Sequence, residues 1–171
     1  IVEFERATSQ YRKILEADPN HVIALNNLAY RLATDEAAPS EASRYLQGTL
    51  PNGLAFARNG DFLISNFGTD RLEIMSRDGP STVLADKIDG EPIGKVNFVL
   101  RDSRDRIWMT VSTRKTNWME ALRTDLADGY LARYERGAVH IVAEGFRFTN
   151  EIRFDAKEEF LYVVETTGGC I

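Results

Sequence analysis

One short pattern, repeated three times, constrains the fold of this chain more than any other feature. Each copy has an asparagine, a strand of alternating apolar residues, a polar turn and a second strand. The copies begin at Asn52, Asn97 and Asn150, a spacing of roughly 45 to 53 residues. A repeat of that length is typical of a four-stranded propeller blade. We therefore predict that residues 48–171 form an all-β partial propeller of about two and a half blades.

Further apolar runs predict the outer strands of these blades. They follow the first pair at 71–76 and 82–85, and the second pair at 130–134 and 138–143. The third unit begins at Phe148 and stops after two strands. Sequential antiparallel strands joined by regular turns favour meandering blades over a sandwich.

Residues 1–47 show a helical periodicity instead. Apolar residues recur three and four positions apart over 4–15 and again over 22–32. Pro19 ends the first stretch, because proline disfavours helical geometry in the residue before it. Ser40 suits the N-cap of a third helix. We expect two parts: a short all-α module over 1–47 and the partial propeller over 48–171.

The helical part resembles the tetratricopeptide repeat. The matching positions are Ala7, Tyr11, Ile14 and Pro19 of one helix pattern, then Leu25, Leu28, Ala29 and Leu32 of the other, with Ala42 and Leu46 resuming the first. This covers little more than one repeat, whereas at least three are normally needed for a stable superhelix. The resemblance implies either a groove for a protein partner or a helical cap that only covers apolar surface.

The strand part resembles the gluconolactonase, senescence-marker-protein and luciferin-regenerating-enzyme family. The stretch 52–56 carries the resemblance, together with Asn97 and the residues Asp102, Arg106 and Trp108 that follow it. The family implies a six-bladed propeller with a divalent metal, commonly calcium, in its channel, and hydrolysis of lactones or esters. It further implies that Asn150 is a metal ligand and that Asn97 contacts the substrate.

The chain departs from the family pattern at two positions near Asn97. Lys95 stands where the family often has arginine, and Phe98 stands where it has aspartate. Lysine keeps a charge that suits an anionic substrate but loses the bidentate geometry of arginine. The family's other two metal ligands would fall inside the helical module and beyond Ile171. Asparagine before a strand also often forms a turn with its own backbone, so either role stays open for Asn150, and Asn52 is assigned mainly to the turn.

A long insertion at 112–127 has helical spacing around Trp118. Loops of this length are often functional lids, and the alternative is a short helix that packs Trp118 against the propeller edge. Neither His21 nor His140 has a serine or cysteine motif nearby, so no nucleophilic triad is expected and the catalytic residues stay unassigned.

Composition excludes several classes of function. The net charge of -5 and the pI near 5.1 argue against nucleic-acid binding, which needs a basic face. No apolar run reaches the about 18 residues of a membrane helix, and the N-terminus lacks the features of a signal peptide. The default location is therefore cytoplasmic, although the missing initiator Met indicates that the natural chain begins before Ile1. The single cysteine, Cys170, permits no internal disulfide.

These patterns predict a calcium-dependent hydrolase of lactones or esters, incomplete within this chain. Two other hypotheses stay open: a protein-interaction module without chemistry, and an inactive fragment or fusion. An unclosed propeller would expose an unpaired strand edge, which favours association.

Overall fold

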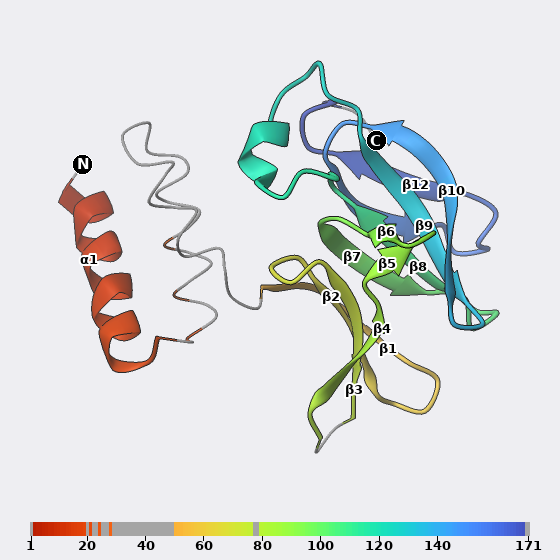
Figure 1. The fold of residues 1–171 in the computed structure, drawn as a ribbon, viewed down its shortest axis with the longest axis horizontal. Helices are drawn as coiled ribbons and strands as arrows, with labels where there is room; N and C mark the ends of the chain where they lie inside the picture. The colour runs from red at the N-terminus through yellow and green to blue at the C-terminus, as the bar shows by residue number, and fades with distance from the viewer. Residues whose placement is uncertain are drawn as a thin grey trace. The chain divides into compact units, whose positions relative to one another are not determined.

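Figure 1 shows the chain in a computed structural model, which describes residues 2–19, 21, 24, 28, 50–76 and 79–169. The chain divides into two compact units, Ile1–Leu50 and Pro51–Ile171. No helix of the described residues is long and apolar enough to span a membrane.

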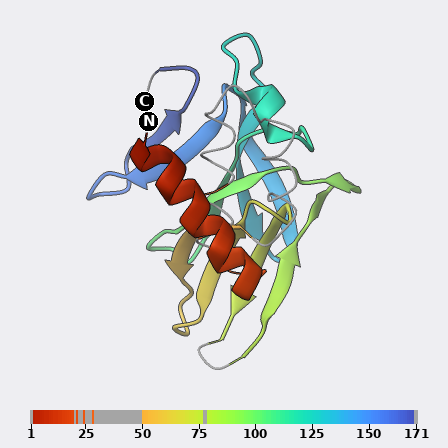
Figure 2. The same ribbon diagram turned by 90° about the vertical axis from the view of Figure 1, so that its left-hand side faces the viewer.

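In the first unit, α1 (Val2–Ala17) forms where the first helical stretch was predicted. It is drawn in red in Figure 2 and runs without a kink. Pro19 follows it, as expected from the constraint that proline places on the preceding residue. Beyond it, the Nδ1 atom of His21 accepts a hydrogen bond from the N–H of Ala24 at 3.2 Å.

The described residues do not support a tetratricopeptide-like module. Among them, α1 is the single α-helix with defined bounds. Ala24 and Leu28 are helical and buried, but the predicted helices over 22–32 and 40–46 otherwise lie outside the described part of the chain. The pairing of helices that defines the repeat is therefore not shown.

The second unit is built from antiparallel sheets in which neighbouring strands follow one another along the chain. Blade one contains β1 (Pro51–Phe56), β2 (Phe62–Asn66), β3 (Arg71–Met75) and β4 (Ser81–Ala85). Blade two contains β7 (Val96–Arg101), β8 (Ile107–Val111), β9 (Gly129–Glu135) and β10 (Ala138–Phe146). The half-blade contains β11 (Thr149–Phe154) and β12 (Leu161–Glu165), and a short pair, β5 (Lys87–Ile88) and β6 (Glu91–Pro92), links the two full blades. The predicted partial propeller is confirmed.

Alternate residues of a strand serve opposite faces of a blade, so β8 takes part in two cores. Met109 packs toward blade one, where it joins Leu63 and Leu72. Trp108, the residue before it, packs toward the half-blade and Ile152. Fully burying one such apolar side chain contributes roughly 1.5–3 kcal/mol. The alternation therefore stabilises both interfaces from one five-residue strand.

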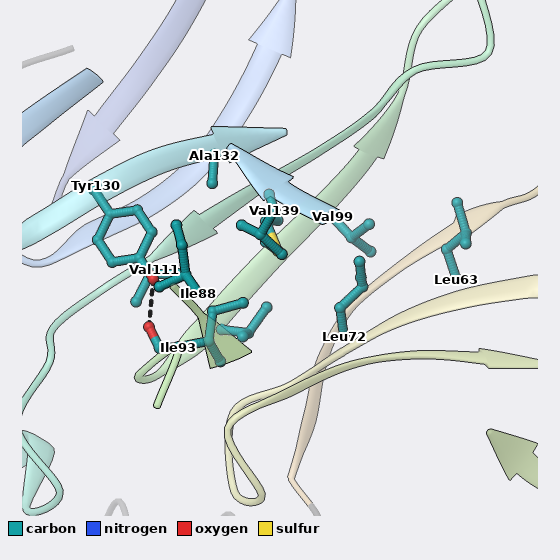
Figure 3. Packing of buried hydrophobic residues seen from close by; sticks show 11 residues of the cluster. Leu63, Leu72, Ile88, Ile93, Val99, Val111, Tyr130, Ala132 and Val139 are labelled. Carbon is teal, nitrogen blue, oxygen red and sulfur yellow. Dashed lines mark hydrogen bonds between the residues drawn. The ribbon is translucent and has the colours of Figure 1, made fainter. Parts of the chain in front are cut away.

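A buried tyrosine ties the linker to the first of these cores. Tyr130 of β9 is fully buried, and its hydroxyl donates a hydrogen bond to the carbonyl of Ile93 (Figure 3). Burial raises the pKa of Tyr130 to about 12. The phenol thus stays neutral, and it satisfies a linker carbonyl inside the core.

Candidate functional site

The three repeated asparagines stand where the innermost strands of successive blades begin. β7 contacts both β1 and β11, so these strands lie in a row. The side-chain amide of Asn52 donates to the Oδ1 of Asn97 at 2.8 Å and to its carbonyl at 3.1 Å. We call this edge, marked by Asn52, Asn97 and Asn150, the mouth.

In blade two and in the half-blade the asparagine binds a hydroxyl of its own blade. The Nδ2 of Asn97 donates to the Oγ of Ser112 at 2.8 Å, and the Nδ2 of Asn150 donates to the Oγ1 of Thr166 at 3.1 Å. Each hydroxyl stands one residue beyond the second strand of its blade. The amide therefore ties the start of the first strand to the end of the second, a side-chain contact that the turn interpretation did not foresee.

The amide oxygens differ in how far the protein occupies them. The Oδ1 of Asn97 is taken by Asn52, and Asn97 is only 4% exposed. None of the described residues donates to the Oδ1 of Asn150, which is partly exposed, or to that of the exposed Asn52. The structure thus brings the predicted Asn97 and Asn150 to the same edge, but only Asn150 keeps its oxygen for a ligand.

Lys95, the predicted anion-binding residue, is neutralised inside the protein. It is 7% exposed, and its Nζ lies 2.8 Å from the Oδ1 of Asp70 and 5.9 Å from the ring centroid of Phe67. Asp70 belongs to the turn between β2 and β3 and adopts φ 58°, in the left-handed region that aspartate tolerates. The ammonium group therefore has a partner from the preceding blade.

The insertion after β8 packs against residues that border the mouth. It contains the 3₁₀ helix η1 (Trp118–Ala121), whose last residue is buried. The ring of Trp118 meets Phe67 edge-on at a centroid distance of 5.7 Å and lies 6.0 Å from Phe148. Such aromatic pairs contribute about 0.5–1.5 kcal/mol each beyond area burial. This arrangement corresponds to the packed alternative rather than to an open lid.

The described residues alone do not fit a metal ion. Among them, no three His, Cys, Asp or Glu side chains are grouped so that they could hold one. Calcium takes 6–8 oxygen ligands, whereas Asn150 offers one neutral oxygen. Two acidic residues of its blade, Glu151 and Glu165, have partners of their own: Glu151 lies 3.7 Å from the guanidinium of Arg153, and Glu165 accepts the N–H of Arg147 at 2.7 Å. The role of Asn150 as a ligand stays a prediction.

Sequence reasoning missed a pair of hydroxyls that link one blade to the next. Ser65 and Thr110 donate to the backbone carbonyls of Asn97 and Asn150 at 2.8 and 2.6 Å. Each also accepts the N–H of the residue after its own blade's asparagine, at 2.7 and 3.1 Å. Their signal in the sequence is a hydroxyl residue at the same distance after Asn52 and after Asn97. Strand pairing places Val164 at this position of the half-blade.

The pattern Asp102, Arg106 and Trp108, which carried part of the family resemblance, fixes a turn away from the mouth. Asp102 accepts the backbone N–H of Arg106 at 2.8 Å and the indole N–H of Trp108 at 2.9 Å. Burial by itself acts to raise the pKa of this carboxyl, but the hydrogen bonds from Trp108 and Arg106 outweigh it and lower the pKa below its ordinary value. These residues are structural.

No family model and no curated protein matches this sequence. Among solved structures, a gluconolactonase from Xanthomonas campestris is 19% identical with a TM-score of 0.60, covering 72% of this chain and 43% of that one. A candidate gluconolactonase is 18% identical with a TM-score of 0.56, covering 68% and 41%. A catalytically inactive virginiamycin B lyase from Staphylococcus aureus, solved with quinupristin, is 16% identical with a TM-score of 0.51, covering 71% and 36%. The chain thus spans less than half of each of these proteins, and the likeness shows that its strands have a gluconolactonase-like propeller fold.

Proposed function

We propose that the strand unit is part of a propeller hydrolase that opens lactones or related esters at the mouth. The observation that carries this proposal is the gathering of three equivalent asparagines at one edge, with the oxygen of Asn150 left without a donor among the described residues. The gluconolactonase named above supports it, because that protein has the same fold.

The charge balance of the mouth favours a neutral substrate. Lys95 is paired with Asp70, so the groups that remain are amides and hydroxyls. Such groups can donate to the ring oxygen or carbonyl of a lactone and accept from its hydroxyls. We therefore propose a neutral ring ester rather than an anionic one. Asn150 would orient it.

The activation of water is not assigned to any described side chain. Among these residues the carboxylate of Asp70 is paired with Lys95, whereas Asp128 accepts the hydroxyl of Thr113 at 2.8 Å through its Oδ2 and has a buried Oδ1 without a hydrogen-bond partner. The same residues do not complete a calcium site, so we assign no step of the reaction to a metal.

The test is to measure the hydrolysis of a panel of lactones and an aryl ester in a pH-stat, with and without calcium. We expect turnover that Asn150→Ala lowers by about a hundredfold, the scale for losing one positioned polar group at a reacting carbonyl. The matched control is Asn59→Ala, because Asn59 lies in an exposed turn and, of the residues that the structure describes, binds only Asp61. Absence of turnover in the wild type under every condition, or equal rates for Asn150→Ala and the control, would contradict the proposal.

A further inference from the structure

The chain contains two asparagine–glycine pairs, and the structure places them in opposite surroundings. One is Asn52–Gly53, near the start of β1, and the other is Asn59–Gly60, in the turn between β1 and β2. Asparagine is a thermolabile residue, because the backbone nitrogen that follows it can attack the carbon of its side-chain amide. Glycine favours this attack, since it has no Cβ to shield its nitrogen or to restrict its backbone. The fold therefore decides which of the two pairs can react.

The turn leaves the backbone of the second pair accessible. Asn59 and Gly60 are both exposed. Gly60 has φ +88°, and no described atom lies within 4 Å of the place where its Cβ would stand. Its N–H donates to the carbonyl of Ala57 at 3.0 Å, a hydrogen bond that water can replace because the turn is exposed. The nitrogen of Gly60 can therefore move without disturbing the core.

The side chain of Asn59 is folded back over this nitrogen. Its Oδ1 accepts the N–H of Asp61 at 3.2 Å, and its Nδ2 donates to the Oδ2 of Asp61 at 2.7 Å. An asparagine oxygen that binds the N–H two residues further on closes a turn around the peptide between them. The amide carbon of Asn59 is thereby held beside the nitrogen that would attack it.

The first pair is held apart by strand pairing. Gly53 is buried and pairs with Ser65 of β2, whose Oγ accepts its N–H at 2.7 Å. A Cβ on Gly53 would come within 3.0 Å of the Cα of Phe98 in β7, so this backbone has no room to turn. The side-chain amide of Asn52 donates to Asn97 instead. β1 must separate from its neighbours before this pair can react.

We propose that Asn59 is a site of spontaneous deamidation in the folded protein and that β1 protects Asn52 from the same reaction. The nitrogen of Gly60 bonds to the side-chain amide carbon of Asn59, and the bond from this carbon to Nδ2 breaks. The proton of the attacking N–H leaves with Nδ2 as ammonia, and a cyclic succinimide remains. Water then adds to one of the two ring carbonyls and breaks its bond to the nitrogen, which gives aspartate or isoaspartate. Water is the only co-reactant, and the inference does not depend on the proposed hydrolase function.

The product changes the charge of the turn. A neutral amide becomes a carboxylate, which adds one negative charge to the net charge of -5. The new carboxylate faces that of Asp61, so repulsion between like charges replaces the hydrogen bond from Nδ2. In isoaspartate the main chain between β1 and β2 is also longer by one carbon.

The test is to incubate the full chain at neutral pH and to follow its tryptic peptides by mass spectrometry. Trypsin cuts after Arg58, which separates Asn52 from Asn59. Deamidation raises the mass of a peptide because O–H replaces NH₂, fragment masses assign the gain to one residue, and a sample taken at time zero corrects for reaction during digestion. We expect product to form at Asn59 at least about tenfold faster than at Asn52, since the strand must open before Asn52 can react.

The same incubation in guanidinium chloride is the matched control. Unfolding frees both pairs, so the two rates should approach each other. Asn59→Gln should abolish the gain at this position, because the attack would then have to close a larger ring.

Three results would overturn the proposal. They are no product at Asn59 in the folded protein, equal rates at Asn59 and Asn52 in the folded protein, and a difference between the rates that persists unchanged after unfolding. The last result would assign the difference to neighbouring residues in the sequence and not to the fold.

Discussion

Replacing Thr110 with valine removes a hydroxyl that serves two blades at once. Thr110 is fully buried, and its Oγ1 donates to the carbonyl of Asn150 and accepts the N–H of Phe98. Valine has nearly the same shape and is equally suited to a strand, so the change is confined to these two hydrogen bonds. A buried polar group left without a partner costs about 1–3 kcal/mol. Both bonds join groups that are only partly buried, so water replaces part of each loss, and together they lower the free energy of unfolding by about 1–3 kcal/mol, a substantial share of the 5–15 kcal/mol typical of a domain.

Urea unfolding followed by tryptophan fluorescence measures this loss. Both tryptophans, Trp108 and Trp118, belong to the strand unit, so their signal reports that unit. Thr82→Val is the matched control, because the hydroxyl of Thr82 binds the carbonyl of Ile74 at 3.3 Å on an exposed strand. The control should stay within about 0.5 kcal/mol of the wild type. If Thr110→Val behaves like the control, the hydroxyl does not link the blades.

Three further predictions concern the fold. Asp102→Asn should lower the free energy of unfolding at neutral pH. The difference in this free energy between the wild type and the variant should shrink as acid protonates the wild-type carboxyl. The reason is that a pKa lowered in the folded state contributes stability above the ordinary carboxyl pKa and loses it as the pH falls through the lowered value; urea midpoints that stay equally far apart at every pH would refute this. Trp118→Ala should lower the free energy of unfolding by about 1–3 kcal/mol, less than for a fully buried tryptophan, and an unchanged thermal midpoint would show that the insertion does not pack. Gly94→Ala should lower the thermal midpoint more than Gly137→Ala, since both have positive φ but only at Gly94 does a Cβ come within 2.6 Å of a backbone oxygen, with nothing described within 4 Å at Gly137. Equal shifts of the thermal midpoint in the two variants would contradict this prediction.

The blades could be predicted because their signals are local. Alternation with a period of two, and turns such as the one around Asp102, are properties of short stretches of sequence. The helical module could be predicted less well, because a tetratricopeptide-like repeat is defined by contacts between helices and not by the pattern of one helix. In the described residues only α1 has defined bounds, and the resemblance alone could not supply its partners.

The mouth was predicted in outline but not in its contacts. Equivalent positions in successive blades brought Asn97 and Asn150 to one edge, which the repeat alone implies. The pairing of Lys95 with Asp70 joins residues from different blades, and no local pattern specifies such a contact. The same holds for the inter-blade hydrogen bonds of Ser65 and Thr110, which depend on how one sheet stacks on the next.

The most direct test of a functional mouth is NMR of the asparagine side-chain amides during titration with a lactone, with and without calcium. The account predicts a saturable shift of the Asn150 side-chain amide, because its oxygen has no donor among the described residues. The Asn97 amide should stay in place, since Asn52 occupies its oxygen and Ser112 accepts from its nitrogen. A saturable shift confined to Asn97, or no shift at either residue, would contradict the claim that ligands bind at this edge.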